Sequence, residues 1–304
     1  MQKIVFDPIG ETLYSSHPDN GPQIFVSLRP GYAKAFALFA VRYGGNDLQY
    51  QWDKKWKILP AGTAHFLEHK LFDTKDGGAD QLLATQGALS NAFTTPFMTA
   101  YYFECTENFE QSLKILLQFV SEPYFTKENV AKEQGIIGQE IQMGADNPEL
   151  RAYYNLLNCL YLSHPIKDRV IGTVESIREI TPELLYDCHE AFYNPSNMVL
   201  CVAGDVSPDT VEKMVLETLH PAGGKAPIRN YGPAEAPVSA SPRQEETMEV
   251  SAPLFYIGWK QPLSEADPLE EQLTGELACE LLFGSSSPLY ARLYADGLID
   301  HDFG

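Results

Sequence analysis

His65-Phe66-Leu67-Glu68-His69 places two imidazoles four positions apart, with a carboxylate directly before the second. In an α-helix, residues four apart lie one above the other on one face, and a residue three positions on lies beside them. His65 and His69 would then supply half of a tetrahedral zinc site. Glu68, if it is not a ligand itself, would take a proton from a metal-bound water. The stretch therefore predicts a helix that carries part of a catalytic zinc site.

The order H-x-x-E-H is the reverse of the zinc motif H-E-x-x-H and is the signature of the inverzincins. The alternative is an ordinary helix that carries two histidines while Phe66 and Leu67 pack into the core. A motif is only a hypothesis until its context agrees with it, so the rest of the chain decides between the two.

Composition bounds the class of protein. The 304 residues are more than one compact core usually needs, so two domains are expected. A hydrophobic content of 44% with 12% aromatic residues is typical of a globular protein. The net charge of -19 argues against a nucleic-acid partner, because sequence-independent binding needs a basic face. This charge favours neutral or basic partners, or is simply a solvated acidic surface.

The sequence also predicts where the protein works. Its first residues contain no basic segment followed by an apolar run, so no signal peptide is expected. No stretch approaches the roughly 18 apolar residues of a membrane span, so no membrane partner is expected. The five cysteines are scattered, with no C-x-x-C pattern, which is typical of reduced thiols. These features together predict a cytoplasmic protein.

The predicted elements indicate an α+β fold, because strands and helices are mixed without alternating one for one. Alternating apolar residues and turn signals predict strands at 11–16, 23–28, 33–43, 89–94, 100–106, 197–203 and 249–260. After the metal helix, helical spacing predicts helices at 77–86, 109–120, 127–143, 148–162, 182–193, 209–219, 269–283 and 288–295. Thr63 is the expected N-cap of the metal helix. Residues 46–57 are polar, contain two tryptophans and are interpreted as a surface insertion.

A change in composition predicts the domain boundary. Eight of the 24 residues from 221 to 244 are proline or glycine, which is typical of a linker. The chain is therefore expected to consist of a metal-bearing domain at 1–220, the linker 221–244 and the beginning of a second, incomplete domain at 245–304. The order of elements after the linker loosely echoes that of the first domain.

A catalytic zinc site needs a third protein ligand and an open position for water. Asp73 is near in sequence, but its short side chain would lie a full helical turn beyond His69. Glu133 and Glu140 are seven positions apart and would share a helix face, about 10 Å apart along the axis. Only one of them would reach the metal while the other orients it, and spacing alone leaves open which does so. The alternative is two acids on a solvated helix face.

At this point the sequence resembles the M16 zinc peptidases, the family of pitrilysin, insulysin and the mitochondrial processing peptidase. The family's pattern is H-x-x-E-H, then a ligand glutamate roughly seventy residues later that is the second of a pair seven apart. Here that residue would be Glu140. The resemblance extends over nearly all of residues 11–220 and is closest to the bacterial subunits with a single metal. It is carried by Ser90-Asn91-Ala92-Phe93-Thr94-Thr95, Tyr101-Tyr102-Phe103, Ser121-Glu122-Pro123, His164-Pro165, Gly172-Thr173-Val174-Glu175-Ser176-Ile177, Phe192-Tyr193-Asn194-Pro195-Ser196-Asn197-Met198 and Val202-Ala203-Gly204-Asp205-Val206.

The resemblance implies a role for each matching position. His65, His69 and Glu140 would bind one zinc ion per chain. Glu133 would not bind the ion but would contact and orient one of these ligands. Glu68 would be the general base that acts on the zinc-activated water. Four residues would bind the substrate on an exposed strand edge, where an extended peptide adds as a further strand: Asn91, Ala92, Phe93 and Thr94. His164 and His189 are expected to be structural.

The implied fold is a mixed, mainly antiparallel sheet packed with helices, followed by the start of a second homologous domain. Gly284-Ser285-Ser286-Ser287-Pro288-Leu289-Tyr290 and Gly297-Leu298 carry the resemblance there. The family builds a chamber from four such domains and uses an arginine/tyrosine pair in a later domain or partner. The sequence offers no candidate pair, so it is expected to be a fragment or a departure from the family.

The predicted function is a zinc metalloendopeptidase that cleaves extended peptides with Glu68 as the general base. Full activity is expected to need a C-terminal part and a partner, as a homodimer or as a heterodimer with a subunit that lacks H-x-x-E-H, so that the 304-residue chain alone is inactive. The alternative is a non-catalytic structural or assembly subunit of an M16-like complex. A scaffold has no physical need for His65, Glu68, His69 and Glu140, which favours the enzyme.

Overall fold

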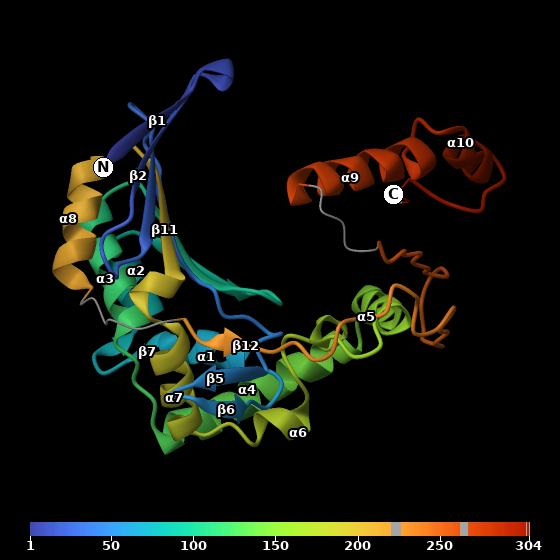
Figure 1. Ribbon diagram of the computed structural model, residues 1–304, viewed down its shortest axis with the longest axis horizontal. Helices are drawn as coiled ribbons and strands as arrows, with labels where there is room; N and C mark the ends of the chain where they lie inside the picture. The colour runs from blue at the N-terminus through green and yellow to red at the C-terminus, as the bar shows by residue number, and fades with distance from the viewer. Residues whose placement is uncertain (220–225, 262–266, 302, 304) are drawn as a thin grey trace. The chain divides into compact units, whose positions relative to one another are not determined.

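The computed structural model describes residues 1–219, 226–261, 267–301 and 303 (Figure 1). The chain divides into two compact units, Met1–Trp259 and Lys260–Gly304, and each is described by itself. Residues 221–225 of the predicted linker lie outside the described residues. Among the described helices, none combines the length and apolar character that crossing a membrane would require.

A seven-stranded sheet forms the frame of the first unit, in the order β1-β2-β3-β11-β4-β10-β9. Neighbouring strands are antiparallel except β11 and β3, so the sheet is mixed and mainly antiparallel, as the sequence predicts. Its strands are β1 (Gln2–Phe6), β2 (Glu11–Ser16), β3 (Gln23–Leu28), β4 (Ala35–Val41), β9 (Leu89–Thr94), β10 (Thr99–Cys105) and β11 (Met198–Gly204). Strand β9 therefore lies at one edge of this sheet.

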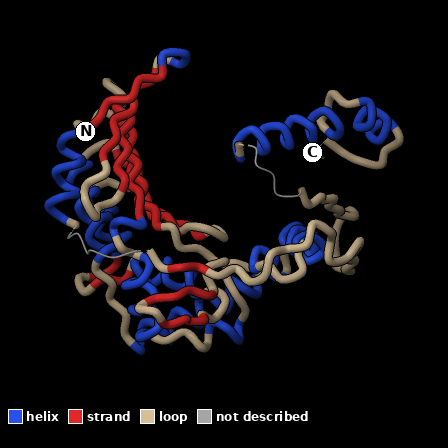
Figure 2. The backbone as a smooth tube through the Cα atoms, viewed as in Figure 1, coloured by secondary structure: helices blue, strands red, loops and turns tan. Residues whose placement is uncertain are grey.

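Two smaller sheets accompany it. One contains β5 (Gln49–Trp52), β6 (Lys55–Ile58) and β12 (Ile228–Arg229), and the other contains β7 (Asp73–Thr74) and β8 (Gly77–Gly78). The helices of the first unit are α1 (Thr63–Leu71), α2 (Ala79–Thr85), α3 (Phe109–Ser121), α4 (Lys127–Ala145), α5 (Pro148–Leu160), α6 (Val174–Ile177), α7 (Pro182–Phe192) and α8 (Pro208–Thr218). In Figure 2 the strands of the large sheet run together beside helices, and the short strands lie among helices, an α+β arrangement.

Helix α1 begins one residue earlier than predicted. Its N-cap is Gly62, not Thr63, and the Thr63 hydroxyl donates to the Pro60 carbonyl instead. Gly62 has a φ of 93°, and a Cβ there would come within 2.5 Å of the Ile171 carbonyl oxygen. Only glycine combines that left-handed backbone with so close an approach, which is why the cap falls on this residue.

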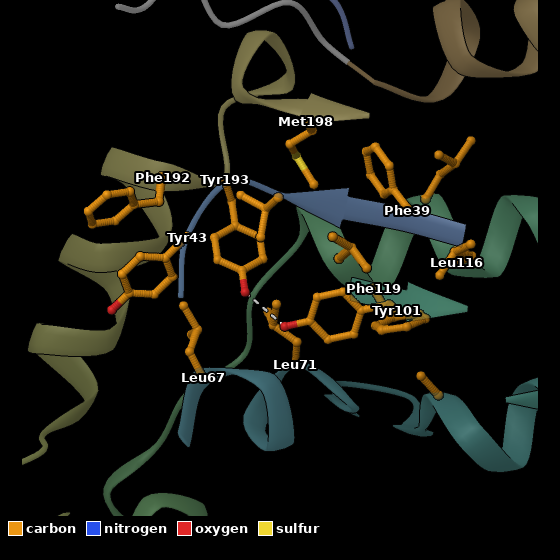
Figure 3. Close-up of a cluster of buried hydrophobic side chains, with 14 of the residues drawn as sticks. Phe39, Tyr43, Leu67, Leu71, Tyr101, Leu116, Phe119, Phe192, Tyr193 and Met198 are labelled. Carbon is orange, nitrogen blue, oxygen red and sulfur yellow. Dashed lines mark hydrogen bonds between the residues drawn. The ribbon is translucent and has the colours of Figure 1, made fainter. Parts of the chain in front are cut away.

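The core lies against the helix face opposite the two histidines. Leu67 and Leu71 of α1 are at most 1% exposed and project toward the aromatic residues of the sheet (Figure 3). There the hydroxyls of Tyr101 and Tyr193 are hydrogen-bonded at 2.8 Å, which satisfies two polar groups inside an apolar cluster. Burial of this face fixes the direction in which the other face of α1 points.

Two predicted elements differ in the structure. Residues 46–57 are not merely a surface insertion, because β5 and β6 form a hairpin whose Tyr50 is fully buried. Residues 249–260 form no strand, and apolar side chains such as Phe255, Ile257 and Trp259 are more than half exposed. A strand requires a neighbour to hydrogen-bond with, and within the described ranges no strand pairs with this segment.

Residues 226–248, here named the strap, follow the surface of the first unit after the undescribed part of the linker. Arg229 in β12 forms an ion pair with Asp47, with Nε and Oδ1 3.0 Å apart and both side chains at most 10% exposed. The Tyr231 hydroxyl donates to the same carboxylate oxygen at 3.0 Å. Farther on, the Glu235 carboxylate accepts three consecutive backbone N–H groups, from residues 162 to 164. The strap is therefore attached through charged groups.

The second unit contains α9 (Pro268–Phe283) and α10 (Pro288–Ala295). Helix α10 begins as the sequence predicts, with Pro288 behind a Ser287 cap, and α9 begins one residue before the predicted Leu269, with Pro268 behind an Asp267 cap. Leucines recur along α9 at four-residue spacing and are more than half exposed: Leu269, Leu273, Leu277 and Leu281.

Candidate metal centre

Helix α1 carries the centre because its amphipathic pattern fixes its rotation. With Leu67 and Leu71 in the core, His65 and His69 share the other face, and their ring centroids are 4.6 Å apart. Both side chains are largely buried, with 13% and 27% of their surface exposed. The spacing of four residues in the sequence therefore becomes a pair of adjacent imidazoles.

Glu140 of α4 completes a group of three donors. Its carboxylate oxygens lie 3.6 Å from His65 Nε2 and 3.8 Å from His69 Nε2. One donor atom from each residue lies within 4.8 Å of the other two. Ligands of a tetrahedral zinc are about 2.0–2.1 Å from the ion, which places them roughly 3.3–3.5 Å from one another. The donor set and its spacing fit a zinc ion with a fourth position open.

The protonation of His65 suits metal binding. Burial, together with the neighbouring His69, lowers the pKa of the His65 imidazole to about 3. A neutral imidazole offers a lone pair, which a metal ion requires. His65 Nδ1 is buried and, within the part of the chain that the structure describes, has no hydrogen-bond partner.

Glu133 contacts the Nδ1 side of the His69 ring and is not one of the three metal donors. Its Oε1 is 3.0 Å from His69 Nδ1, and because a carboxylate only accepts, the imidazole donates and leaves Nε2 free to bind a metal. Burial alone would raise the pKa of Glu133, but the hydrogen bond from His69 and the charge of Lys70 lower it overall. Burial also acts to lower the pKa of His69, and the nearby carboxylates, Glu133 first, raise it.

Glu68 presents a carboxylate beside the same cluster. It is only 7% exposed, and burial raises its pKa above the ordinary value. The Thr94 hydroxyl donates to Glu68 Oε2 at 2.5 Å. A carboxylate held by one hydrogen bond and otherwise free to accept a proton has the properties of a general base.

The predicted substrate residues lie on the edge strand β9, which packs against α1. Asn91 and Phe93 are exposed, whereas Ala92 and Thr94 are half-buried, as expected for a strand whose side chains alternate. Strand β9 pairs with β10 on one side only, so along its other side its backbone groups have no strand partner among the described residues. The Asn91 side chain accepts a hydrogen bond from the Ala92 amide.

Some residues are placed away from the donor atoms. The Asp73 carboxylate pairs with Lys70 and does not join the three ligands. The His189 Nε2 bonds to the Val120 carbonyl, and the His164 Nδ1 accepts from the Ile166 amide, so both histidines make structural bonds.

Sequence reasoning missed Lys70. It is 1% exposed and pairs with Glu133 as well as with Asp73. The available signal was its position four residues after Phe66 and three after Leu67, which places a lysine on the apolar side of the helix.

Two family models match the chain. The model described as insulinase (peptidase family M16) matches residues 60–174, and that described as peptidase M16 inactive domain matches residues 179–302. The three donor residues and Glu68 all fall within the first match.

Known proteins and solved structures are similar to this chain over most of its length. The uncharacterized zinc protease YmfH of Bacillus subtilis (strain 168) is 39% identical over 310 residues, which is 100% of this chain and 72% of the relative. A crystal structure of a candidate M16-like peptidase from Alicyclobacillus acidocaldarius is 35% identical, with a TM-score of 0.87 over 97% of this chain and 70% of that one. A protease structure from Helicobacter pylori, 21% identical with a TM-score of 0.73, covers 94% of this chain and 69% of that one and is alike in fold.

Proposed function

The chain belongs to peptidase family M16, and from that premise we propose that it is a zinc-dependent endopeptidase that hydrolyses extended peptides. One observation carries the proposal: the three donor atoms of His65, His69 and Glu140 converge beside a buried carboxylate and an open strand edge. A metal site, a base and a peptide-binding edge are the parts that peptide hydrolysis requires.

His65, His69 and Glu140 would hold the metal, and their donor set of two imidazoles and one carboxylate matches the preference of catalytic zinc. When bound, zinc lowers the pKa of a coordinated water and polarises the scissile carbonyl. Glu68 takes a proton from the attacking water and returns it to the leaving amine. Burial of Glu68 supports this role, because its raised pKa brings the carboxylate closer to the operating pH.

Strand β9 is the proposed substrate site. An extended peptide placed along it would hydrogen-bond with the backbone of Asn91 to Thr94 and run past the metal centre. Because these contacts involve backbone groups, they would select for an extended conformation more than for particular side chains. The exposed side chains of Asn91 and Phe93 would then contact the substrate directly.

Two substitutions test the proposal. His69→Ala should abolish binding of about one zinc per chain, because it removes one of three protein ligands. Glu68→Gln should retain zinc but reduce peptide cleavage by at least about 1,000-fold, because an amide cannot take the proton. Metal analysis and cleavage of a quenched fluorescent peptide measure both. If Glu68→Gln cleaves at the normal rate, Glu68 is not the base.

A non-catalytic assembly role is the competing function. It is favoured by the match of residues 179–302 to a model described as an inactive domain, although the metal donors lie outside that match. The same measurement separates the two functions: a scaffold would bind no stoichiometric zinc, and its assembly would not respond to Glu68→Gln.

We further propose that full activity needs a partner, either a second copy or a subunit without H-x-x-E-H. The partner would supply the arginine/tyrosine pair that the resemblance to M16 peptidases implies, which stabilises a developing oxyanion. Co-expression with the partner should raise the rate of peptide cleavage by the chain at least tenfold, and a metal chelator should abolish this increase. Full cleavage by the purified chain at a concentration at which it is monomeric would contradict this.

A further inference from the structure

The structure contains a buried cation that the proposed reaction does not use. The Lys70 side chain is 2% exposed and lies on the flank of α1 between the metal-facing side and the core. Burial of an ammonium group costs several kcal/mol unless the group is paired and hydrogen-bonded. The groups that pair with Lys70 therefore indicate the role of this lysine.

Both partners of Lys70 are carboxylates. The Nζ atom lies 3.3 Å from Glu133 Oε2 and also pairs with Asp73, which is half-exposed at the C-terminal end of α1. The other oxygen of Glu133 accepts the hydrogen bond of His69 Nδ1 at 3.0 Å. A continuous chain of contacts therefore runs from Asp73 through Lys70 and Glu133 to a proposed metal ligand.

We propose that Lys70 is a positioning residue of the metal centre: it fixes the Glu133 carboxylate so that Glu133 holds His69 with Nε2 directed at the metal. The inference rests on the proposed zinc site. A carboxylate that is hydrogen-bonded through one oxygen only can rotate about its terminal bond. Hydrogen bonds to both oxygens prevent this rotation. The hydrogen bond from His69 Nδ1 sets the orientation of that ring, and Lys70 fixes the carboxylate that accepts this bond.

Charge gives a second reason for a lysine at this position. Three carboxylates lie at the centre, those of Glu68, Glu133 and Glu140, and two of them are buried. A divalent ion would face Glu68 and Glu140, and the ammonium group of Lys70 faces Glu133 and the half-exposed Asp73. A neutral side chain of similar length would fill the space but leave one buried carboxylate without a counter-charge.

A double-mutant cycle tests the inference. Zinc dissociation constants are measured by competition with a chelator for the unmodified chain, Lys70→Met, Glu133→Gln and the double variant. We expect each single variant to bind zinc roughly tenfold more weakly, the size typical of lost outer contacts to a metal ligand. The double variant should bind no more weakly than Glu133→Gln, because Lys70 acts through Glu133. Additive losses, or unchanged affinity in Lys70→Met, would overturn the inference.

The design separates several explanations. Lys57→Met is the matched control, because Lys57 pairs with Asp187 on β6 and α7, away from the donors, and its loss should leave zinc affinity unchanged. Should Lys70→Met fail to fold, Lys70→Gln takes its place in the cycle: a loss of zinc affinity that disappears in the Glu133→Gln background supports the inference, and a loss that persists there overturns it. The visible bands of the Co²⁺-loaded protein add a readout of ligand geometry and should change in Lys70→Met. Absence of zinc binding by the unmodified chain would overturn the proposed function as well, which distinguishes the two failures.

Discussion

Thr94 is the residue at which the substrate edge and the catalytic carboxylate meet. It ends β9, and its hydroxyl donates to Glu68 at 2.5 Å. It is thus both a member of the proposed peptide-binding strand and the hydrogen-bond donor that orients the proposed base. A peptide that pairs with β9 would bind next to the group that fixes Glu68.

Thr94→Val should lower kcat about tenfold while KM and zinc affinity stay nearly unchanged, because a hydrogen bond to a charged group is worth roughly 1.5–3 kcal/mol. Thr94→Ser should restore most of the rate, since it keeps the hydroxyl. Steady-state kinetics with a peptide substrate measure both variants. Thr85→Val, on the exposed face of α2, is the control. A serine variant as slow as the valine variant would contradict the role of the hydroxyl.

His189 links stability to pH without touching the metal centre. It is 8% exposed, stacks on Tyr193 and donates from Nε2 to the Val120 carbonyl at 2.8 Å. Burial lowers the pKa of its imidazole to about 4. The unfolded chain, with a histidine pKa near 6.5, binds the proton more readily, so stability falls as the pH drops from about 6.5 toward 4.

The free energy of unfolding should therefore decrease by about 2 kcal/mol between pH 7 and pH 5 because of this residue. His189→Gln should remove that part of the pH dependence, although it lowers stability at both pH values. Urea unfolding of the chelator-treated chain at the two pH values measures it. His17→Gln changes an exposed histidine and should leave the slope intact. Equal slopes in the unmodified chain and His189→Gln would refute the assignment.

At the residue scale, the sequence could predict which residue types gather at the centre but not how each carboxylate is used. Glu133 and Glu140 share a helix face, and their spacing in the sequence does not indicate which of the two is the metal ligand. The choice depends on how deeply α4 packs against α1, which places Glu140 with the imidazoles and Glu133 behind His69. Lys70 was missed because its burial depends on partners from outside its own helix.

At the scale of elements, α1 has two functions because its two faces differ. One face is anchored by Leu67 and Leu71 in the core, and the other carries the histidines. Any change that loosens the anchored face should also disturb the distances between the metal donors. Packing and chemistry are therefore coupled through one short helix.

Leu67→Ala should destabilise the first unit by about 3 kcal/mol, the usual cost of removing a fully buried leucine side chain and leaving a cavity. Leu216→Ala on α8 is the control, since Leu216 is 54% exposed and its loss should cost no more than about 0.5 kcal/mol. Denaturant unfolding with a chelator present measures both without a contribution from bound metal. A loss of less than 1 kcal/mol for Leu67→Ala would show that the core face of α1 relaxes.

Elements with strong local signals could be predicted. The caps Asn147 and Thr181, each followed by a proline, begin α5 and α7 as expected. Elements that depend on distant partners could not be predicted. The hairpin of β5 and β6 reads as polar, yet it is built around the buried Tyr50 and paired with a strand about 180 residues away. The apolar segment 249–260 reads as a strand but has no strand beside it in the described ranges.

At the scale of the whole molecule, composition predicts a boundary near residue 220, which stays a prediction. Composition reports only that a segment is rich in proline and glycine, and does not report what that segment contacts. The described part of 221–244 includes β12, Arg229, Tyr231 and Glu235, all bonded to the first unit. These contacts are long-range pairings of single residues, which leave no periodic signal in a sequence.

The strap determines where the metal-bearing part can be cut out for expression. A piece that stops at residue 219 loses Arg229 and Tyr231 and leaves the Asp47 carboxylate, 1% exposed, without its cation. That piece should be at least about 3 kcal/mol less stable than residues 1–259, the cost of breaking a buried ion pair on one side. Asp47→Asn should destabilise the longer piece but stabilise the shorter one, a reversal of sign that urea unfolding would detect. A cut within the Pro/Gly-rich stretch is therefore expected to give a less stable piece than a cut after Trp259, which retains the strap.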